Sequence, residues 1–315
     1  MNILNTSSHW LITGGAGFIG SHLARELVRQ GQQVTVFDNL SGGKLENLAA
    51  VKDKISFIQG DIRDFATVLE ACKGVDYVLH LAALISVAES MAKPQETAQI
   101  NVQGTVNVLE AAKQCGVKRV VFSSSAAVYG TRPELPYKED TPIDCQSPYA
   151  WSKQAGAELC QLYTKAYGVE AIALRYFNVF GPGQNPNSAY AAVIAKFMQL
   201  ATDNQPLGID WDGLQSRDFV NVKDVVQANL LAATKGVPGE IYNVASGRTH
   251  TLLELADTIE KVSGRKLARV SRPKRPGDVH ESSADISKIK KLGFVPSVSL
   301  EEGLQEMWNE TKADK

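Results

Sequence analysis

The sequence has no long hydrophobic run, almost no net charge and no secretion signal. No stretch of the 315 residues reaches eighteen consecutive apolar residues, so we expect no membrane-spanning helix. The formal net charge of −1 argues against a nucleic-acid or anionic-membrane partner, because either would require a basic surface patch. The first residues, MNILNTSSHW, lack both a positive region and a cleavage site, so we predict no signal peptide. These absences favour a cytoplasmic protein.

The cysteines are few and scattered. Their positions include no C-x-x-C spacing: Cys72, Cys115, Cys145 and Cys160. An even number of cysteines could form disulfides, but free thiols in a reducing compartment fit a chain of this size better. We also predict no metal site. The composition that remains, 44% hydrophobic and 21% charged, is that of an ordinary soluble globular protein.

Short apolar runs alternate with helical patterns in the first half of the chain. The runs occupy residues 10–13, 33–38, 55–60, 77–81, 119–124 and 170–175. Each run is nearly free of charge, as a strand buried on both faces would be. Segments such as FIGSHLARELVRQG and NVQGTVNVLEAAKQCG have helical periodicity, with Gly31 and Gly116 as stops. The alternation predicts the α/β class, with a doubly wound parallel sheet between two helical layers.

The pattern changes after residue 177. A Gly/Pro/Asn loop, GPGQNPNSAY, precedes a helical stretch and the turn-rich segment LGIDWDGLQSRDF. A further helix and strand, residues 222–235 and 240–244, would return to the sheet, and the remainder suggests a small helical lobe. The predicted division is a sheet domain and a smaller, mainly helical C-terminal substrate lobe. The sheet domain covers residues 1–177 with a return near 220–245, and the lobe covers 178–219 and 246–315.

The segment TGGAGFIGSHL follows the first predicted strand and opens the first helix. Gly14, Gly17 and Gly20 stand there in G-x-x-G-x-x-G spacing. Glycines let the backbone turn tightly and approach a pyrophosphate at a helix N-terminus, where unpaired N–H groups favour anions. Such a cluster can also be only a tight turn. Its place between a strand and a helix favours a dinucleotide site of the Rossmann type.

Carboxylates end the next two predicted strands at the same edge of the sheet. Asp38 lies 24 positions after Gly14, where a carboxylate accepts hydrogen bonds from ribose hydroxyls and repels a 2′-phosphate. The predicted cofactor is therefore NAD rather than NADP. Asp61, in GDIRD, could accept from the adenine amino group. The ordinary alternatives are a turn residue before Asn39 for the first and a strand terminator for the second.

Tyr149 and Lys153, in SPYAWSKQAGAE, stand four residues apart and would share one face of a helix. The spacing alone carries little weight, because a chain with nine tyrosines produces Tyr-x-x-x-Lys readily by chance. The physical case is stronger. A tyrosine with a pKa of about 10 is a poor base, but nearby positive charge favours its phenolate. Tyr149 could then take a proton from a substrate hydroxyl.

Eight motifs occur in an order typical of a known family. They are TGGAGFIGSHL, FDNLSGG, GDIRD, HLAA, NVQGT, SSSAAVYG, YAWSK and RYFNVFGP. Between about residue 10 and residue 285 the chain resembles the extended short-chain dehydrogenase/reductases, and within them the UDP-glucose and UDP-N-acetylglucosamine 4-epimerases. The resemblance implies an NAD-dependent isomerase that oxidises a UDP-hexose at C4 and returns the hydride to the opposite face of the 4-keto sugar.

The resemblance also implies roles for individual residues. The catalytic set would be Ser125, Tyr149 and Lys153. The implied NAD contacts are Gly14, Gly17, Phe18, Ile19, Gly20, Asp38, Asn39, Leu40, Ser41, Gly42, Asp61, Ile62, Leu81, Ala82, Ala83, Asn101, Ser123, Tyr149, Lys153, Tyr176 and Phe177. The implied substrate contacts are Ser86, Ser125, Tyr149, Asn178, Ala192, Val193, Arg217, Arg275, Asp278 and Ser282. The arginines would hold the UDP phosphates, although a lone arginine is usually a surface charge and a serine at a strand end can be a cap.

The residues after Ser125 bear on the reaction type. Related dehydratases carry Asp-Glu there and decarboxylases carry Glu nearby, whereas this chain has Ala126 and Ala127, which cannot transfer protons. The resemblance therefore favours epimerisation over elimination. A UDP-uronate 4-epimerase and a net NAD-linked nucleotide-sugar dehydrogenase remain alternatives.

Two departures from the family pattern concern the substrate. Trp211, in IDWDG, stands where the family usually has glycine, which affects the contacts expected to the uridine. Ser282 stands where a tyrosine would border the C2 substituent, which predicts room for an N-acetyl group. The family usually forms homodimers through two helices per subunit, here NVQGTVNVLEAAKQ and YAWSKQAGAELCQLYTKAY.

Overall fold

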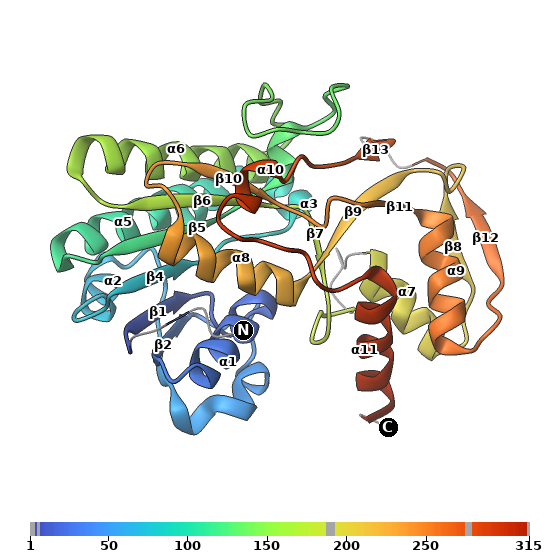
Figure 1. Ribbon diagram of the computed structural model, residues 1–315, viewed down its shortest axis with the longest axis horizontal. Coiled ribbons are helices and arrows are strands. Elements are labelled where there is room, and N and C mark those ends of the chain that lie inside the picture. The colour runs from blue at the N-terminus through green and yellow to red at the C-terminus, as the bar shows by residue number, and fades with distance from the viewer. Residues whose placement is uncertain (1–3, 5–6, 187–192, 275–278, 314–315) are drawn as a thin grey trace.

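A seven-stranded sheet forms the centre of the larger unit in the computed structural model, which describes residues 4, 7–186, 193–274 and 279–313 (Figure 1). Its strand order is β10-β6-β5-β4-β1-β2-β3, and every pairing is parallel. The strands are β1 (His9–Thr13), β2 (Gln33–Asp38), β3 (Ser56–Gln59), β4 (Tyr77–His80), β5 (Arg119–Ser125), β6 (Ala171–Tyr176) and β10 (Ile241–Val244). The order reverses between β1 and β4, so the predicted doubly wound fold is confirmed.

Helices cover both faces of this sheet (Figure 1). One layer consists of α1 (Phe18–Arg29), the 3-10 helix η1 (Leu45–Lys54) and α8 (Val222–Lys235). The opposite layer consists of α2 (Phe65–Ala71), α5 (Gly104–Cys115) and α6 (Pro148–Tyr167). Each layer closes its own core, and successive strand residues alternate between the two cores. This burial on both faces explains why the strands are nearly continuous apolar runs in the sequence.

Several short helices lie between β4 and α6 along the chain. They are α3 (Val87–Ala92), α4 (Pro94–Thr97), the π-helical turn η2 (Ala98–Gln103) and the 3-10 helix η3 (Ala126–Tyr129). The periodicity predicts one continuous helix from residue 101, whereas η2 widens the backbone before α5 begins. Isolated π-helical turns often occur at functional sites. The predicted stop at Gly116 is confirmed, since this residue caps α5 in the left-handed conformation.

A second unit is built around its own core. Its helices α7 (Val193–Thr202), α9 (Leu252–Ser263) and α11 (Leu300–Ala313) enclose a third core. Two small sheets flank them. One contains β7 (Asn178–Phe180), β9 (Ser216–Asn221), β11 (Thr249–Thr251) and β13 (Glu281–Ser282), and the other contains β8 (Leu207–Asp210) and β12 (Arg269–Arg272). The segment LGIDWDGLQSRDF, which the sequence predicts to be rich in turns, thus contributes to two strands, β8 and β9, joined by a short turn.

One stretch of the predicted lobe packs with the sheet domain. Ala284, Ile286, Ile289 and Phe294 are buried in the same core as α1 and α8. The short helix α10 (Ser287–Lys290) lies against β10 at the sheet edge. The boundary drawn from the sequence is therefore too simple, because the chain returns from the lobe to cover the edge strand before it enters α11.

Three further features concern the part of the chain that the structure describes: membrane-spanning helices, metal clusters and thiols. No helix in it has the length and apolar character needed to cross a bilayer. The same residues include no cluster of His, Cys, Asp and Glu side chains suited to a metal ion. All four cysteines are free thiols, and Cys72 and Cys160 are buried.

Candidate active site

The predicted site residues of the sheet domain gather at the carboxyl edge of the parallel sheet. Six strands contribute, since the glycine segment follows β1 and the others follow or end β2, β3, β4, β5 and β6. Ligands of open α/β sheets bind outside these strand ends, beside the point where the strand order reverses. The topology therefore assembles in one place residues that lie as far apart in the sequence as Gly14 and Phe177.

The glycine segment fits a dinucleotide pyrophosphate. Gly14 has a φ of +70°, and a Cβ there would lie 2.7 Å from the backbone N of Ala82 after β4. A Cβ at Gly20 would collide with the carbonyl oxygen of Gly14. Helix α1, which begins with Phe18 and Ile19, has no side-chain cap at Gly17 and no acidic residue in its first turn. Its free N–H groups and positive dipole end are thus available to an anion.

Asp38 connects the glycine segment to the loop after β2. Its carboxylate is almost fully buried and accepts hydrogen bonds from the backbone N of Ala16 at 2.9 Å and of Leu40 at 2.8 Å. Each carboxylate oxygen keeps a further lone pair, which suits the ribose hydroxyls of NAD. The loop then continues through exposed Ser41 and Gly42. A 2′-phosphate would have to approach this buried negative charge.

Asp61 is engaged by its own loop. Its carboxylate accepts from the Arg63 guanidinium at 2.7 and 2.9 Å and from the Asn39 amide at 3.1 Å. The hydrogen bonds from Arg63 hold the pKa of Asp61 far below its usual range. An adenine amino group would share this carboxylate with Arg63. The next residue, Ile62, is buried and would meet any Cβ placed at Gly104 on α5.

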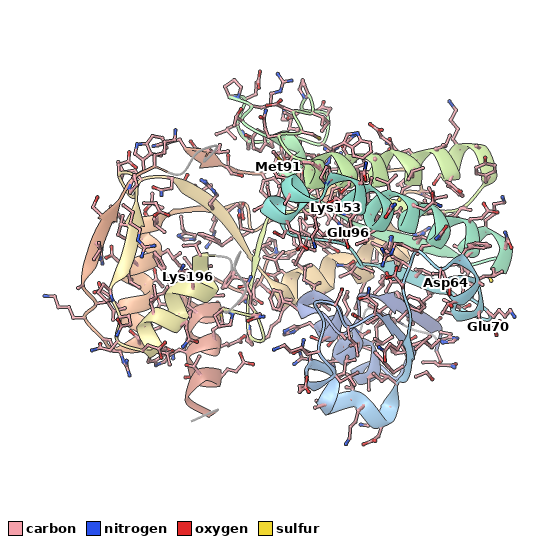
Figure 2. The ribbon with its side chains drawn as sticks, turned by 180° about the vertical axis from the view of Figure 1, so that it is seen from behind. Asp64, Glu70, Met91, Glu96, Lys153 and Lys196 are labelled. Carbon is pink, nitrogen blue, oxygen red and sulfur yellow. The ribbon has the colours of Figure 1, made fainter. Side chains whose placement is uncertain are left out.

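The three predicted catalytic residues lie together where β5 meets α6. Tyr149 is in the first turn of α6, and the side chain of Ser125 at the end of β5 is near enough to its hydroxyl to lower the pKa of Tyr149. Lys153, one turn further along α6, donates from Nζ to the carbonyl oxygen of Ser123 at 2.8 Å. The same Nζ lies 6.0 Å from the centroid of the Tyr149 ring. Figure 2 shows Lys153 near the middle of the molecule.

Burial dominates the ionisation of this pair. It lowers the pKa of Lys153 to about 7 and raises the pKa of Tyr149, which the neighbouring Ser125 side chain only partly offsets. The lysine charge alone therefore does not produce the phenolate that the sequence argument invoked. The cause is the burial of both side chains, and Lys153 directs Nζ to a carbonyl oxygen of β5. Positive charge from an oxidised nicotinamide ring would act against the burial effect.

The remaining predicted cofactor residues occupy the neighbouring strand ends. Leu81, Ala82 and Ala83 follow β4 and are half-buried. Tyr176 and Phe177 end β6, but their side chains pack in the core. The Asn101 side chain is also buried, and it holds neighbouring protein groups.

The predicted substrate residues are spread over both units. Asn178 is exposed at the start of β7, and Val193 is the first residue of α7. Arg217 on β9 is the register partner of Ser282 on β13. Ser86 caps α3 by accepting from the Glu89 backbone N at 3.0 Å. Three predicted contacts lie outside the described residues: Ala192, Arg275 and Asp278.

Trp211 forms the turn between β8 and β9 in a left-handed conformation, with a φ of +55°. Its ring lies 3.8 Å from Lys274 Nζ and packs edge-on against His280. A side chain is uncommon in this conformation, which explains why the family pattern has glycine there. This turn of the lobe consequently carries a cation–aromatic cluster of Trp211, Lys274 and His280.

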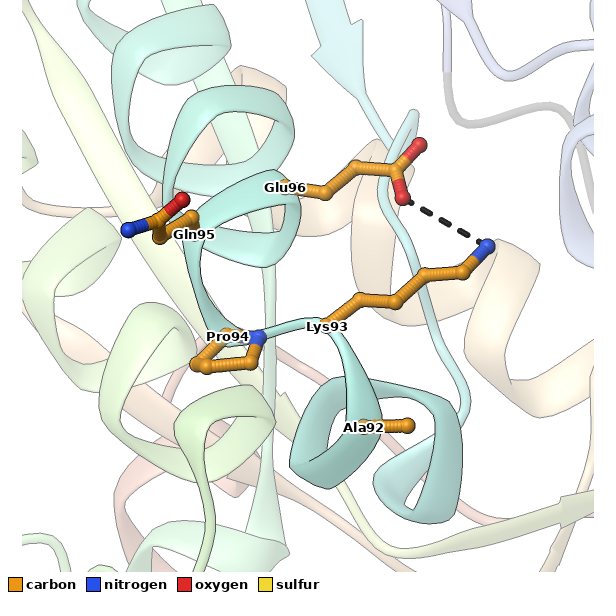
Figure 3. Close-up of a pocket in the computed structure, with 5 residues that line it drawn as sticks. All are labelled: Ala92, Lys93, Pro94, Gln95 and Glu96. Carbon is orange, nitrogen blue, oxygen red and sulfur yellow. Dashed lines mark ion pairs between the residues drawn. The ribbon is translucent and has the colours of Figure 1, made fainter.

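A surface hollow lies where α3 ends and α4 begins. Figure 3 shows the five residues that line it, Ala92 to Glu96, and the ion pair between Lys93 and Glu96 at 3.5 Å. Both charged side chains are exposed, so the pair contributes little to stability. None of the predicted site residues lines this hollow.

Several buried residues beside the site were not singled out from the sequence, although the motifs HLAA, NVQGT and YAWSK contain some of them. Thr13, His80, Thr105, Ser152 and Ser90 all carry buried side chains that hydrogen-bond between the strand ends and α6. The sequence pattern that could have identified them is the presence of polar residues inside otherwise apolar motifs.

The comparisons with known proteins agree with this arrangement. Residues 10–245 match the NAD dependent epimerase/dehydratase family. The chain is 39% identical over 301 residues to a putative UDP-glucose 4-epimerase of Methanocaldococcus jannaschii, with 95% of this chain and 97% of the relative covered. It is 36% identical to a UDP-N-acetyl-alpha-D-glucosaminuronate decarboxylase of Bacillus cytotoxicus, with 94% and 95% covered. The solved UDP-N-acetylglucosamine 4-epimerase of Methanobrevibacter ruminantium, in complex with UDP-N-acetylmuramic acid, superposes with a TM-score of 0.95 at 39% identity, with 99% and 100% covered.

Proposed function

Because the chain belongs to the NAD-dependent epimerase/dehydratase family and is an NAD-dependent isomerase, we propose that it epimerises a UDP-hexose at C4. The favoured pair is UDP-N-acetylglucosamine and UDP-N-acetylgalactosamine, with UDP-glucose and UDP-galactose as further substrates. The observation that carries this proposal is the meeting of Tyr149, Ser125 and Lys153 at the end of β5, beside the glycine segment that fits NAD.

The proposed chemistry assigns one task to each residue of that set. Tyr149 takes the proton from the sugar 4-hydroxyl and later gives it back to the opposite epimer. Ser125, which lies near the Tyr149 hydroxyl, holds the same sugar oxygen. Lys153, anchored to the Ser123 carbonyl, places a positive charge one turn from the phenolate. NAD, which the glycine segment and Asp38 would hold, would supply the hydride acceptor for C4 of the sugar.

The residues after Ser125 favour epimerisation over elimination. Ala126 and Ala127 form the start of η3, directly beyond the catalytic serine. Their methyl groups cannot supply the acid and base that removal of water requires. Oxidation at C4 followed by return of the hydride is the reaction that this set of side chains supports.

The register of β13 supports the N-acetylated substrate. Ser282 is paired with Arg217, which the sequence assigns to the UDP phosphates. Neighbouring strands lie about 4.8 Å apart, so Ser282 is within a side chain's length of that arginine. The half-buried serine is small, and it leaves space where a tyrosine would stand against the sugar ring.

A panel of UDP-sugars tests the reaction. The purified protein, without added reductant, is incubated with both N-acetylhexosamine and both hexose derivatives and with UDP-glucuronic acid, and the products are identified by chromatography and NMR. We expect 4-epimers without stoichiometric NADH. Turnover of the uronate alone would support the uronate epimerase instead, and accumulating NADH would support a dehydrogenase.

Ser282→Tyr tests the substrate preference. The added ring should overpack the C2 side of the sugar and abolish turnover of the N-acetylated pair while sparing the plain hexoses. Glu281→Tyr is the matched control, because the preceding strand residue points to the opposite face of the sheet and should change neither activity. An equal loss of both substrate classes in Ser282→Tyr would contradict the assignment.

We further propose a cytoplasmic homodimer that associates through α5 and α6. Three large apolar side chains of α6 are about half exposed in the single chain: Trp151, Leu162 and Tyr167. Light scattering after gel filtration should give twice the mass of the chain. A monomer at micromolar concentration would refute the dimer without affecting the proposed reaction.

A further inference from the structure

A chain of buried hydrogen bonds runs from the strand before the glycine segment towards α6. It starts at Thr13, the last residue of β1, whose Oγ1 lies 2.7 Å from His80 Nδ1 at the end of β4. The other ring nitrogen, Nε2, lies 3.1 Å from Thr105 Oγ1 on α5. The Thr105 hydroxyl in turn lies 2.6 Å from the carbonyl oxygen of Asn101.

The donors and acceptors of this chain follow from its last bond. A carbonyl only accepts, so Thr105 donates its single proton to Asn101 and must accept from His80 Nε2. The proton of the neutral ring is then on Nε2, and Nδ1 accepts from the Thr13 hydroxyl. The backbone N of Ala82 completes the chain by donating to Thr13 Oγ1 at 3.3 Å. Every hydroxyl and ring nitrogen in it has a partner.

The Asn101 side chain continues the connection to the catalytic helix. Its Oδ1 accepts from the Leu84 backbone N at 2.7 Å, and its Nδ2 donates to the Leu84 carbonyl at 3.0 Å and to Ser152 Oγ at 2.9 Å. Ser152 Oγ donates to the carbonyl of Tyr149 at 2.8 Å. Both amide hydrogens of this side chain are therefore used within the protein.

A second hydrogen bond connects α3 to the same turn of α6. Ser90 Oγ accepts from the backbone N of Tyr149 at 3.1 Å and donates to the Val87 carbonyl at 2.6 Å. Ser90 is fully buried. The catalytic turn of α6 is thus fixed at its backbone N and, through Ser152, at its carbonyl.

We propose that Thr13, His80, Thr105, Asn101 and Ser152 form a positioning network that places the catalytic turn of α6 relative to the cofactor segment. Asn101 is its central positioning residue rather than a ligand of the cofactor. The proposal rests on the function proposed above. Acid–base catalysis depends on placement, and a displacement of about 1 Å can cost on the order of 100-fold in rate.

Single and double variants of Asn101 and Ser152 test the network. Asn101→Ala and Ser152→Ala should each lower kcat about 10-fold, with KM and the Kd for NAD changed less than about twofold. The double variant should be little slower than the slower single variant, because both substitutions break one connection. Ser152→Thr keeps the hydroxyl and should recover most of the kcat lost in Ser152→Ala.

Asn107→Ala is the matched control. Asn107 is also a buried asparagine, six residues further along on α5, and its amide donates to the carbonyls of Ile62 at 2.9 Å and Arg63 at 3.0 Å. We expect a comparable loss of stability but a kcat within about twofold of the wild type at saturating NAD. An equal loss of kcat in this control would show that any buried asparagine matters and would overturn the proposal.

Hydrogen exchange separates this proposal from the proposed reaction. The amides of the first turn of α6 and of residues 84–86 should exchange faster in Asn101→Ala and not in Asn107→Ala, in the absence of any UDP-sugar. If the wild type turned over no UDP-sugar, the proposed function would be wrong, but the exchange rates would still test the network. Unchanged exchange, additive losses of kcat, or an NAD affinity weakened at least 10-fold with kcat retained would overturn the network.

Discussion

Burial disfavours both charged groups that the proposed reaction needs, the Tyr149 phenolate and the Lys153 ammonium. The pKa of Tyr149 is raised and the pKa of Lys153 is lowered to about 7 because neither side chain is well solvated. The Tyr149 phenolate is therefore favoured only by nearby positive charge, and the Lys153 ammonium only by nearby negative charge such as that phenolate. Acid–base tuning of this kind is typical of catalytic residues.

Tyr149→Phe removes the base and keeps the ring. We expect kcat to fall on the order of 10²–10⁴-fold, since general acid–base catalysis contributes about that much. Folding and NAD affinity should be nearly unchanged, because phenylalanine keeps the ring that is buried at this position. Steady-state rates and an NAD titration measure both quantities. A variant that epimerises at a near-normal rate would rule out Tyr149 as the base.

The buried His80 and the half-buried His22 predict how stability depends on pH. Burial lowers the pKa of His80 to about 3 and that of His22 to about 4. The unfolded chain, with histidine pKa values near 6.5, therefore binds protons below about pH 6.5 that the folded protein does not. Each histidine should remove about 1.4 kcal/mol of unfolding free energy per pH unit between about pH 6 and pH 4.

Urea denaturation at pH 7, 6 and 5 measures this slope. His22→Gln is the informative variant, because its amide N can replace Nε2 in the bond to the Pro182 carbonyl, 2.9 Å away, without titrating. In His22→Gln, the unfolding free energy should fall with decreasing pH about half as steeply as in the wild type. A stability that is flat between pH 7 and pH 5 in the wild type would contradict the neutral state of both rings.

At the scale of elements, the packing of α6 on β5 sets the catalytic geometry. Gly156 of α6 lies against the ring of Phe122, and a Cβ there would collide with that ring. Ser124 of β5 also donates to the Lys153 carbonyl at 3.1 Å. The helix that carries Tyr149 and Lys153 is thus held against the strand that carries Ser125.

Gly156→Ala should displace this helix. Overpacking of a well-packed core typically costs about 1–3 kcal/mol, so the melting temperature and kcat should both fall. Glu158→Ala, an exposed substitution two residues further along, should change stability by less than about 0.5 kcal/mol. Equal behaviour of the two variants in calorimetry and turnover would show that α6 does not rest on Phe122 as described.

The same elements show what the sequence could predict. Helix α8 matches its predicted bounds, and each strand of the large sheet was found within two residues, because strands buried on both faces leave an unbroken apolar signal. The short strands of the lobe were not predicted, since their mixed residues resemble turns: β7, β8, β9, β11, β12 and β13. The roles of His80 and Asn101 depend on partners distant in sequence, which no local pattern contains.

At the scale of the whole molecule, the lobe is tied to the sheet domain next to the cofactor segment. His22, on the helix that the glycine segment opens, bonds to Pro182, and Lys223 of α8 pairs with Glu306 of α11 at 2.6 Å. Residues 284–294 return to cover β10. The cofactor edge and the proposed substrate residues are therefore parts of one continuous structure (Figure 1).

The central claim is that a hydride leaves C4 of the sugar and returns to it. The most direct test uses UDP-N-acetylglucosamine that carries deuterium at C4, in ordinary water, with the product examined by NMR and mass spectrometry. The account predicts UDP-N-acetylgalactosamine that retains the deuterium at C4, because a hydride held in the site does not exchange with solvent. A product whose C4 position carries a solvent proton would contradict reversible oxidation at C4.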